Sequence, residues 1–192
     1  MTYYSLLTAK FDELATVDFS GKWSRLVEHF VFGGDGRFLE FVELRARAQS
    51  GYTGSDLEEI DYVASTSSVP IFSKRFVDLI GQTLEDELVF HPCVIECEGR
   101  DYEFFAARTL LRLDLVDAAR SSSRPLPDGS ISLTKLAYLD ESRTDFHIAR
   151  DRSEVFGVVV TDAMRSLCEA HDLKIDFLPK APPGPWIRGG RP

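Results

Sequence analysis

The fold is decided by residues 68–84, which read SVPIFSKRFVDLIGQTL. Pro70 keeps the residue before it extended, and Ser73 belongs to the residue types that cap a helix at its start. After Ser73, apolar side chains recur at the spacing of one helical face: Phe76, Val77, Ile80 and Leu84. The stretch therefore predicts a short extended segment that runs directly into a capped helix near residues 73–84.

A second stretch near the C-terminus shares this design without repeating the sequence. Residues 155–160 (VFGVVV) are typical of a buried strand, and Thr161 is suited to cap a helix that ends near residue 171. The apolar face of that helix is formed by Met164, Leu167, Cys168 and His171. A terminal strand is expected at residues 174–178, followed by a flexible tail, rich in Pro and Gly, at residues 181–192.

The segments between these units predict further strands. They are expected at residues 3–10, 38–48, 88–97, 102–113 and 131–139. Gly99 turns the strand at 88–97 into the strand at 102–113, which predicts a hairpin. Pro92 favours an edge or bulge position for its strand, because proline cannot donate a hydrogen bond to a neighbour.

Residues 23–32 fit either a helix or a strand. Turns or loops are expected at residues 33–36, 49–56, 114–120 and 121–130, with a short helix as an alternative for the third. These patterns predict an α+β fold: a single domain over residues 1–180 with a mostly antiparallel or mixed sheet and two main helices packed on it.

The charge of the chain is concentrated in one segment. Ten carboxylates and two cations lie between Gly54 and Glu98, so this segment carries −8 of the net −9. Such a field attracts a cationic partner and speeds encounter with it, although surface charge is also a common solvated face. The acidic balance argues against nucleic acid as a direct ligand, and it favours basic proteins, small cations or metals as partners.

The sequence also gives expectations about location. The N-terminal residues MTYYSLLTAKFDEL lack a basic region followed by a long apolar one, so we expect no signal peptide. The longest apolar stretch, residues 155–160, is too short to span a bilayer, and we expect no membrane contact. Three cysteines without a dense framework fit a reducing compartment, which predicts a cytoplasmic protein.

Cysteine and histidine side chains are the first candidates for chemistry. Cys93 and Cys97 lie near His91, but their C-x-x-x-C spacing without a second pair is weak for zinc. We expect buried structural thiols there. Cys168 and His171 lie one helical turn apart on an apolar face, which favours a core pair over a nucleophile or ligand pair.

Carboxylates are the second candidates. Four of them alternate around the predicted hairpin turn, as in some metal-dependent nucleases: Glu96, Glu98, Asp101 and Glu103. The usual lysine is missing from the strand, and so acidic a surface would repel a polynucleotide. Residues 139–142 (LDES) with Asp145 are best explained as a strand-end turn. We find no phosphate-binding loop and no serine-histidine context, and predict no catalytic residue, cofactor or metal.

Four blocks of the sequence, in order, resemble one protein family. They are SVPIFSKRFVDLI at 68–80, YEFFAARTLLRLDLVDAARS at 102–121, LAYLDESRTDFHIARD at 136–151 and VFGVVVTDAMRSLCEAHDLKIDFLP at 155–179. Through these blocks, residues 60–180 resemble bacterial polymorphic-toxin immunity proteins of the family known as immunity type eleven. Residues 1–53 match poorly, and asparagines usual in the second block are replaced by Arg108 and by Leu111 or Arg112.

The resemblance implies a protein that binds and neutralises a cognate bacterial toxin or effector, such as a basic nuclease, by stoichiometric inhibition. The predicted partner-binding residues are the carboxylates that flank the block at 68–80: Asp56, Glu58, Glu59, Asp61, Glu85, Asp86 and Glu87. The alternative is an uncharacterised small-molecule enzyme with an acidic pocket. The oligomeric state stays open at this point.

Overall fold

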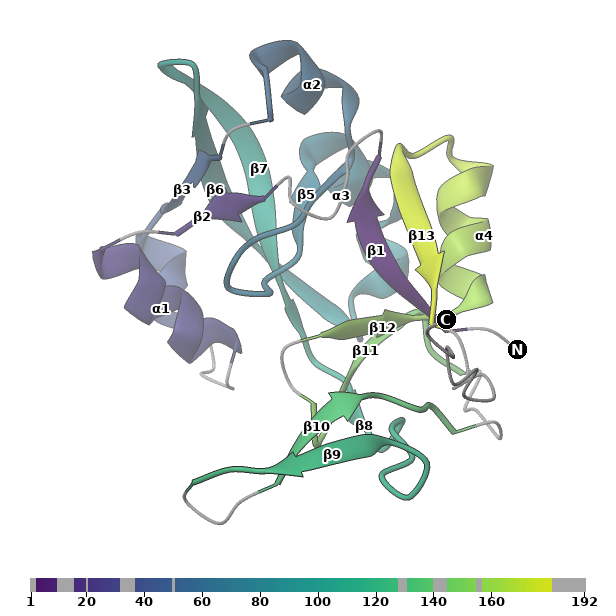
Figure 1. Cartoon of the computed structure of the whole chain (residues 1–192). Helices are drawn as coiled ribbons and strands as arrows, with labels where there is room; N and C mark the ends of the chain where they lie inside the picture. Colours follow the sequence, from purple (N-terminus) through teal and green to yellow (C-terminus); the bar gives the residue numbers. More distant parts are fainter. Residues whose placement is uncertain are drawn as a thin grey trace, which may run out of the picture.

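A computed structural model of the chain describes residues 3–9, 16–19, 21–31, 37–49, 51–127, 131–139, 145–154 and 157–180. The predicted tail at 181–192 and the predicted turn at 33–36 lie outside these described residues. Helices and mixed sheets are combined in the described part, so the predicted α+β class is confirmed. Figure 1 shows the arrangement.

A six-stranded sheet forms one half of the molecule, in the order β2-β3-β6-β7-β5-β4. Its strands are β2 (Val17–Asp18), β3 (Leu44–Ala48), β4 (Tyr62–Val63), β5 (Ile71–Ser73), β6 (Leu88–Cys97) and β7 (Arg100–Thr109). β3 runs parallel to β6, and the other pairs are antiparallel. β6 and β7 form the predicted hairpin, whose turn places Glu98 (φ 52°) and Gly99 (φ 75°) in the left-handed region.

A five-stranded sheet forms the other half, in the order β13-β1-β12-β11-β8. Its strands are β1 (Tyr4–Thr8), β8 (Arg112–Leu113), β11 (Ile148–Asp151), β12 (Val158–Val160) and β13 (Ile175–Pro179). A separate hairpin joins β9 (Ser122–Pro125) to β10 (Ile131–Lys135). The predicted strand at 102–113 is thus split between two sheets, and the loop predicted at 121–130 contains β9.

The described residues form four α-helices: α1 (Lys22–Val31), α2 (Gly54–Glu59), α3 (Lys74–Ile80) and α4 (Asp162–Ala170). α3 and α4 are the two predicted helices, and α1 decides the open choice at 23–32. The loop predicted at 49–56 is wrong at its end, because Thr53 starts α2 in a capping box with Asp56. Two 3₁₀ turns, η1 (Arg37–Phe41) and η2 (Gln82–Leu84), replace the start of a predicted strand and the end of the first predicted helix.

The junction of β5 and α3 forms as its sequence predicts. The Ser73 hydroxyl accepts a hydrogen bond from the Phe76 backbone N–H at 3.1 Å, which caps α3. The Phe76 ring stacks on Phe72 with 4.0 Å between centroids, and both rings are fully buried. α3 therefore lies against one face of the six-stranded sheet, and it shares an apolar cluster with Met164 and Cys168 of α4.

The opposite face of the six-stranded sheet packs against α1. Cys93, Ile95 and Cys97 of β6 point into this cluster with Phe30, which confirms that the two thiols are buried on one face. Pro92 lies just before the part of β6 that pairs with β3, which begins at Cys93. Among the described strands, residues 88–92 pair with β7 alone, so the predicted edge position of Pro92 is confirmed.

No helix in the described part of the chain combines the length and the apolar character needed to cross a membrane.

The segment after β8 is fixed by one buried carboxylate. Asp151 is 2% exposed, and it accepts hydrogen bonds from the backbone N–H groups of Leu115 (2.6 Å), Val116 (2.7 Å) and Ser153 (2.7 Å). Burial alone raises the pKa of Asp151, but the Ser153 hydroxyl and these N–H groups outweigh it, and the pKa lies below its ordinary value.

This depressed pKa predicts a pH-dependent contribution to stability. The contribution of Asp151 is complete above the unfolded pKa of about 4, and it is lost as the pH falls toward the folded value. Asp151→Asn should therefore lower the free energy of unfolding at neutral pH by about 2 kcal/mol, and the gap to the parent should narrow in acid. Urea unfolding of the parent and of Asp151→Asn across this pH range measures the difference in free energy of unfolding.

Asp114→Asn, which removes an exposed ion pair with Arg152, is the control and should change stability by less than about 0.5 kcal/mol. A difference for Asp151→Asn that does not depend on pH would contradict the assignment.

Candidate functional site

The predicted partner-binding carboxylates fall into two groups far apart. Asp56, Glu58 and Glu59 lie on α2, which sits beside the β6–β7 turn, where the Gly54 N–H donates to Glu98 at 3.0 Å. Glu85 and Asp86 lie just before the opposite end of β6. β6 has ten residues, so about 30 Å separates the two groups. Figure 1 shows α2 at one end of the β6–β7 hairpin.

Asp61 was predicted to face a partner, and this is wrong, because the residue is 2% exposed. Its carboxylate accepts hydrogen bonds from the Ser73 hydroxyl (2.5 Å), the Lys174 N–H (2.8 Å) and the Arg75 guanidinium (3.0 Å). The apolar neighbours of Asp61 pull the residue inward, and the three donors replace the water that it loses. Asp61 is therefore an internal tie between β4, α3 and the start of β13.

Glu87 is also wrongly predicted to be free at the surface, because it is 8% exposed. Its carboxylate accepts from the backbone N–H groups of His147 (2.8 Å) and Ile148 (2.7 Å), and it contacts the His147 ring Nδ1 at 2.9 Å. Glu87 precedes β6 and these partners begin β11, so the carboxylate joins the two large sheets.

The remaining members of the predicted set are accessible to different degrees. Glu58, Glu59, Glu85 and Asp86 are exposed. Asp56 is half-buried, and its carboxylate accepts from the Thr53 N–H at 2.8 Å as part of the α2 cap. Five of the seven predicted carboxylates thus reach solvent at least in part, and only those of α2 are joined by other acids.

Those other acids come from the outward face of the six-stranded sheet. Near α2, this face carries ion pairs from Arg45 to Asp101 (2.5 Å) and from Arg47 to Glu96 (3.2 Å), all exposed enough to be weak. Beside them lie the exposed carboxylates of the turn and of β7. We name the four exposed glutamates of this region the α2 surface: Glu58, Glu59, Glu98 and Glu103.

A hollow of about 260 Å³ lies beside the glutamates of the α2 surface. α2, the start of α3 and β7 enclose it, and Glu58, Glu59, Lys74, Tyr102 and Glu103 are among its lining residues. β5 pairs with β7 between Phe104 and Ala106, so residues 100–103 of β7 run past the end of β5. One edge of residues 100–103 therefore faces the hollow, and it pairs with no strand of the described chain. An acidic rim around a strand edge suits a cationic chain segment.

The cysteine and histidine candidates have structural roles or none. Burial raises the pKa of Cys93 and of Cys168 to about 12, so both thiols stay protonated and unreactive at neutral pH. The prediction of a core pair at Cys168 and His171 is confirmed for Cys168 and wrong for His171. α4 ends at Ala170, and His171 is exposed beyond it.

The described residues hold no group of three His, Cys, Asp or Glu side chains that could bind a metal ion. Of the segment 139–142 with Asp145, residues 140–142 lie outside the described residues. The sequence pattern placed Glu98 and Glu103 only among candidate nuclease carboxylates. The fold brings them beside α2, where Glu98 accepts from Gly54, and no local signal in the sequence reveals this.

Comparison of the sequence with models of known protein families gives no match, and comparison with characterised proteins gives none. The resemblance of residues 60–180 to immunity proteins therefore stays a prediction.

Two carboxylates of one acidic segment are expected to differ sharply in their effect on stability. Asp61→Ala should lower the free energy of unfolding by about 3 kcal/mol, because Lys174, Ser73 and Arg75 lose a buried acceptor. Glu58→Ala should change it by less than about 0.5 kcal/mol, since Glu58 is exposed. Urea unfolding of both variants is the measurement, and equal effects would show that Asp61 is no internal tie.

Proposed function

We propose that this protein is a stoichiometric inhibitor, an immunity protein that binds a basic toxin or effector through the α2 surface and blocks it. The observation that carries the proposal is the hollow beside α2, where exposed glutamates border an edge of β7 that no described strand pairs with. The resemblance of residues 60–180 to toxin immunity proteins supports the same conclusion. The inhibitor would act in the cytoplasm of a cell that must survive the toxin.

The charges of the α2 surface suit recognition of a cationic protein. Glu58, Glu59 and Glu103 line the hollow and are exposed, so their field is open to solvent. The two cations of the lining, Lys74 and Arg75, are already paired with Asp78 and Asp61. Fields of this kind raise association rates when the partner is basic. A nuclease binds phosphate with lysine and arginine, so clustered carboxylates can occupy the site that a nucleic acid backbone would fill.

The second acidic group, Glu85 and Asp86, is a weaker candidate for partner binding than the α2 surface. It lies about 30 Å from the α2 surface along β6, and the neighbouring Glu87 is already held by β11. We therefore assign partner binding to α2 and the adjoining end of the hairpin.

The alternative function, a small-molecule enzyme with an acidic pocket, is less well supported by this geometry. Catalysis needs polar groups that converge on one reacting atom. In the hollow beside α2, Glu58, Glu59 and Glu103 are exposed, while the buried Asp61 is already held by its neighbours. This arrangement is better suited to binding a partner.

Co-expression with the product of the adjacent gene tests the proposed function directly. A toxin encoded there should kill the host when expressed alone, and this protein should suppress killing and co-purify with it in a one-to-one complex. Survival without a complex, or a complex that leaves the toxin lethal, would overturn the proposal.

Charge reversal tests the assigned surface. Glu58→Lys combined with Glu59→Lys should slow association with the toxin at least about tenfold at low salt and flatten its salt dependence. Glu85→Lys with Asp86→Lys makes the same change in net charge at the far end of β6, and it should leave the rate within about twofold. Stopped-flow mixing measures both. Equal slowing by the two pairs would mean that net charge, and not the α2 surface, steers binding.

A further inference from the structure

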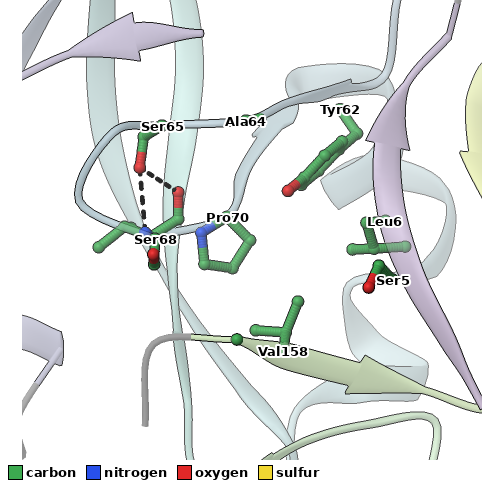
Figure 2. A pocket seen from close by; sticks show the side chains of 10 residues that line it. Ser5, Leu6, Tyr62, Ala64, Ser65, Ser68, Pro70 and Val158 are labelled. Carbon is green, nitrogen blue, oxygen red and sulfur yellow. Dashed lines mark hydrogen bonds between the residues drawn. The ribbon is translucent and has the colours of Figure 1, made fainter. Parts of the chain in front are cut away.

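A second hollow lies between the two large sheets, away from the α2 surface. Its volume is about 200 Å³, and its walls come from β1, β4, β12 and the loop at 64–70. Figure 2 shows the side chains around it, among them Ser5, Tyr62, Pro70 and Val158. No carboxylate is among its described lining residues.

Tyr62 supplies a buried hydroxyl to this hollow. The residue is 6% exposed, its ring packs on Phe72, and its hydroxyl points into the space between Pro70 and Val158 (Figure 2). Burial raises the pKa of Tyr62, so the group is a neutral O–H donor at neutral pH. Within the described part of the chain, no hydrogen bond involves this hydroxyl. The hydroxyl faces the hollow, where it can donate to an acceptor carried by a ligand.

The loop beside Tyr62 is held in a strained shape. The Ser65 hydroxyl accepts from the Val69 N–H (3.0 Å) and donates to the Val69 carbonyl (2.7 Å), as Figure 2 shows. This closes the loop around Ser68, which has a φ of 59° in the left-handed region that residues with a side chain rarely adopt. The strain turns the Ser68 carbonyl toward Arg150, whose guanidinium donates to it at 2.6 Å.

Arg150 brings a positive charge close to the hollow. It is 2% exposed and lies opposite Val158 in the β11–β12 ladder, so both side chains leave the same sheet face. Burial lowers the pKa of Arg150 to about 10, with Tyr62 opposing and Arg112 adding to the change, so Arg150 remains cationic at neutral pH. Its guanidinium bonds the carbonyl of Ser68, which lines the hollow, so the charge lies beside the hollow. Such a field acts strongly where water is scarce.

We propose that this hollow binds a small organic carboxylate, with the Tyr62 hydroxyl donating to it and the charge of Arg150 attracting it. The volume equals that of about six or seven water molecules, which suits an acid of amino-acid size. The site is separate from the α2 surface and does not rest on the proposed inhibition of a toxin.

Two variants test the site and leave the hydrogen bonds of the loop at 64–70 in place. Tyr62→Phe removes only a hydroxyl that bonds no described residue, so the fold should be kept. Gly157→Leu fills the hollow from its wall, since a Cβ at Gly157 meets nothing within 4 Å and its backbone is not left-handed. Tyr102→Phe is the matched control, because Tyr102 lines the other hollow.

The probes are succinate and L-glutamate, with succinamide as the neutral analogue, titrated into the purified full chain and followed by amide NMR shifts. One carboxylate at least should bind with a Kd below about 1 mM and shift the amides of residues 65–69 and 158. Tyr62→Phe should weaken binding about tenfold or more, Gly157→Leu should abolish it, and Tyr102→Phe should leave it unchanged. The proposal is overturned if neither acid binds, if succinamide binds equally well, or if Tyr62→Phe and Gly157→Leu bind as the parent does.

Discussion

One buried carboxylate, that of Asp61, holds together elements that the sequence separates by more than a hundred residues. It receives hydrogen bonds from Ser73, the cap of α3, and from Lys174, which leads into β13, while its own backbone N–H and C=O bond Lys174 and Ser73. Arg75 pairs with Asp61 and also donates to the backbone carbonyls that follow α4. Because the Asp61 carboxylate lies away from water, the bonds that it accepts depend on one another. The positions of α3 and α4 relative to the six-stranded sheet follow from this one group.

Glu87 repeats the principle at the other end of the acidic segment. It binds two consecutive backbone N–H groups at the start of β11, so it fixes one sheet on the other. The segment therefore contains two kinds of carboxylate. Those at the ends of strands satisfy backbone donors between layers, and those on α2 and around Gly99 remain in solvent. Only the second kind is exposed where another molecule can reach it.

The elements that the sequence predicted correctly are those whose caps, turns or apolar spacing lie within a short stretch of chain. The Ser73 cap, the β6–β7 hairpin and α4 follow from residues close in the chain. β9 lies in a serine- and proline-rich stretch and exists because β10 pairs with it, which no local pattern reveals. Asp61 and Glu87 were wrongly predicted to be exposed, because the prediction used their charge and ignored the residues that follow them. Each is followed directly by a run of apolar residues, whereas Glu58 is followed by another acid, and that contrast is present in the sequence.

Residues 100–103 of β7, one edge of which pairs with no described strand, have a consequence for the behaviour of many copies of the chain. A strand edge without a neighbour is a template on which a second copy can pair and begin aggregation. Here Glu58, Glu59 and Glu103 border the edge, so two copies meeting there would bring like charges together. The glutamates that can attract a basic protein thus also keep the chain from pairing with itself, and this edge can stay open at high concentration until the right partner covers it.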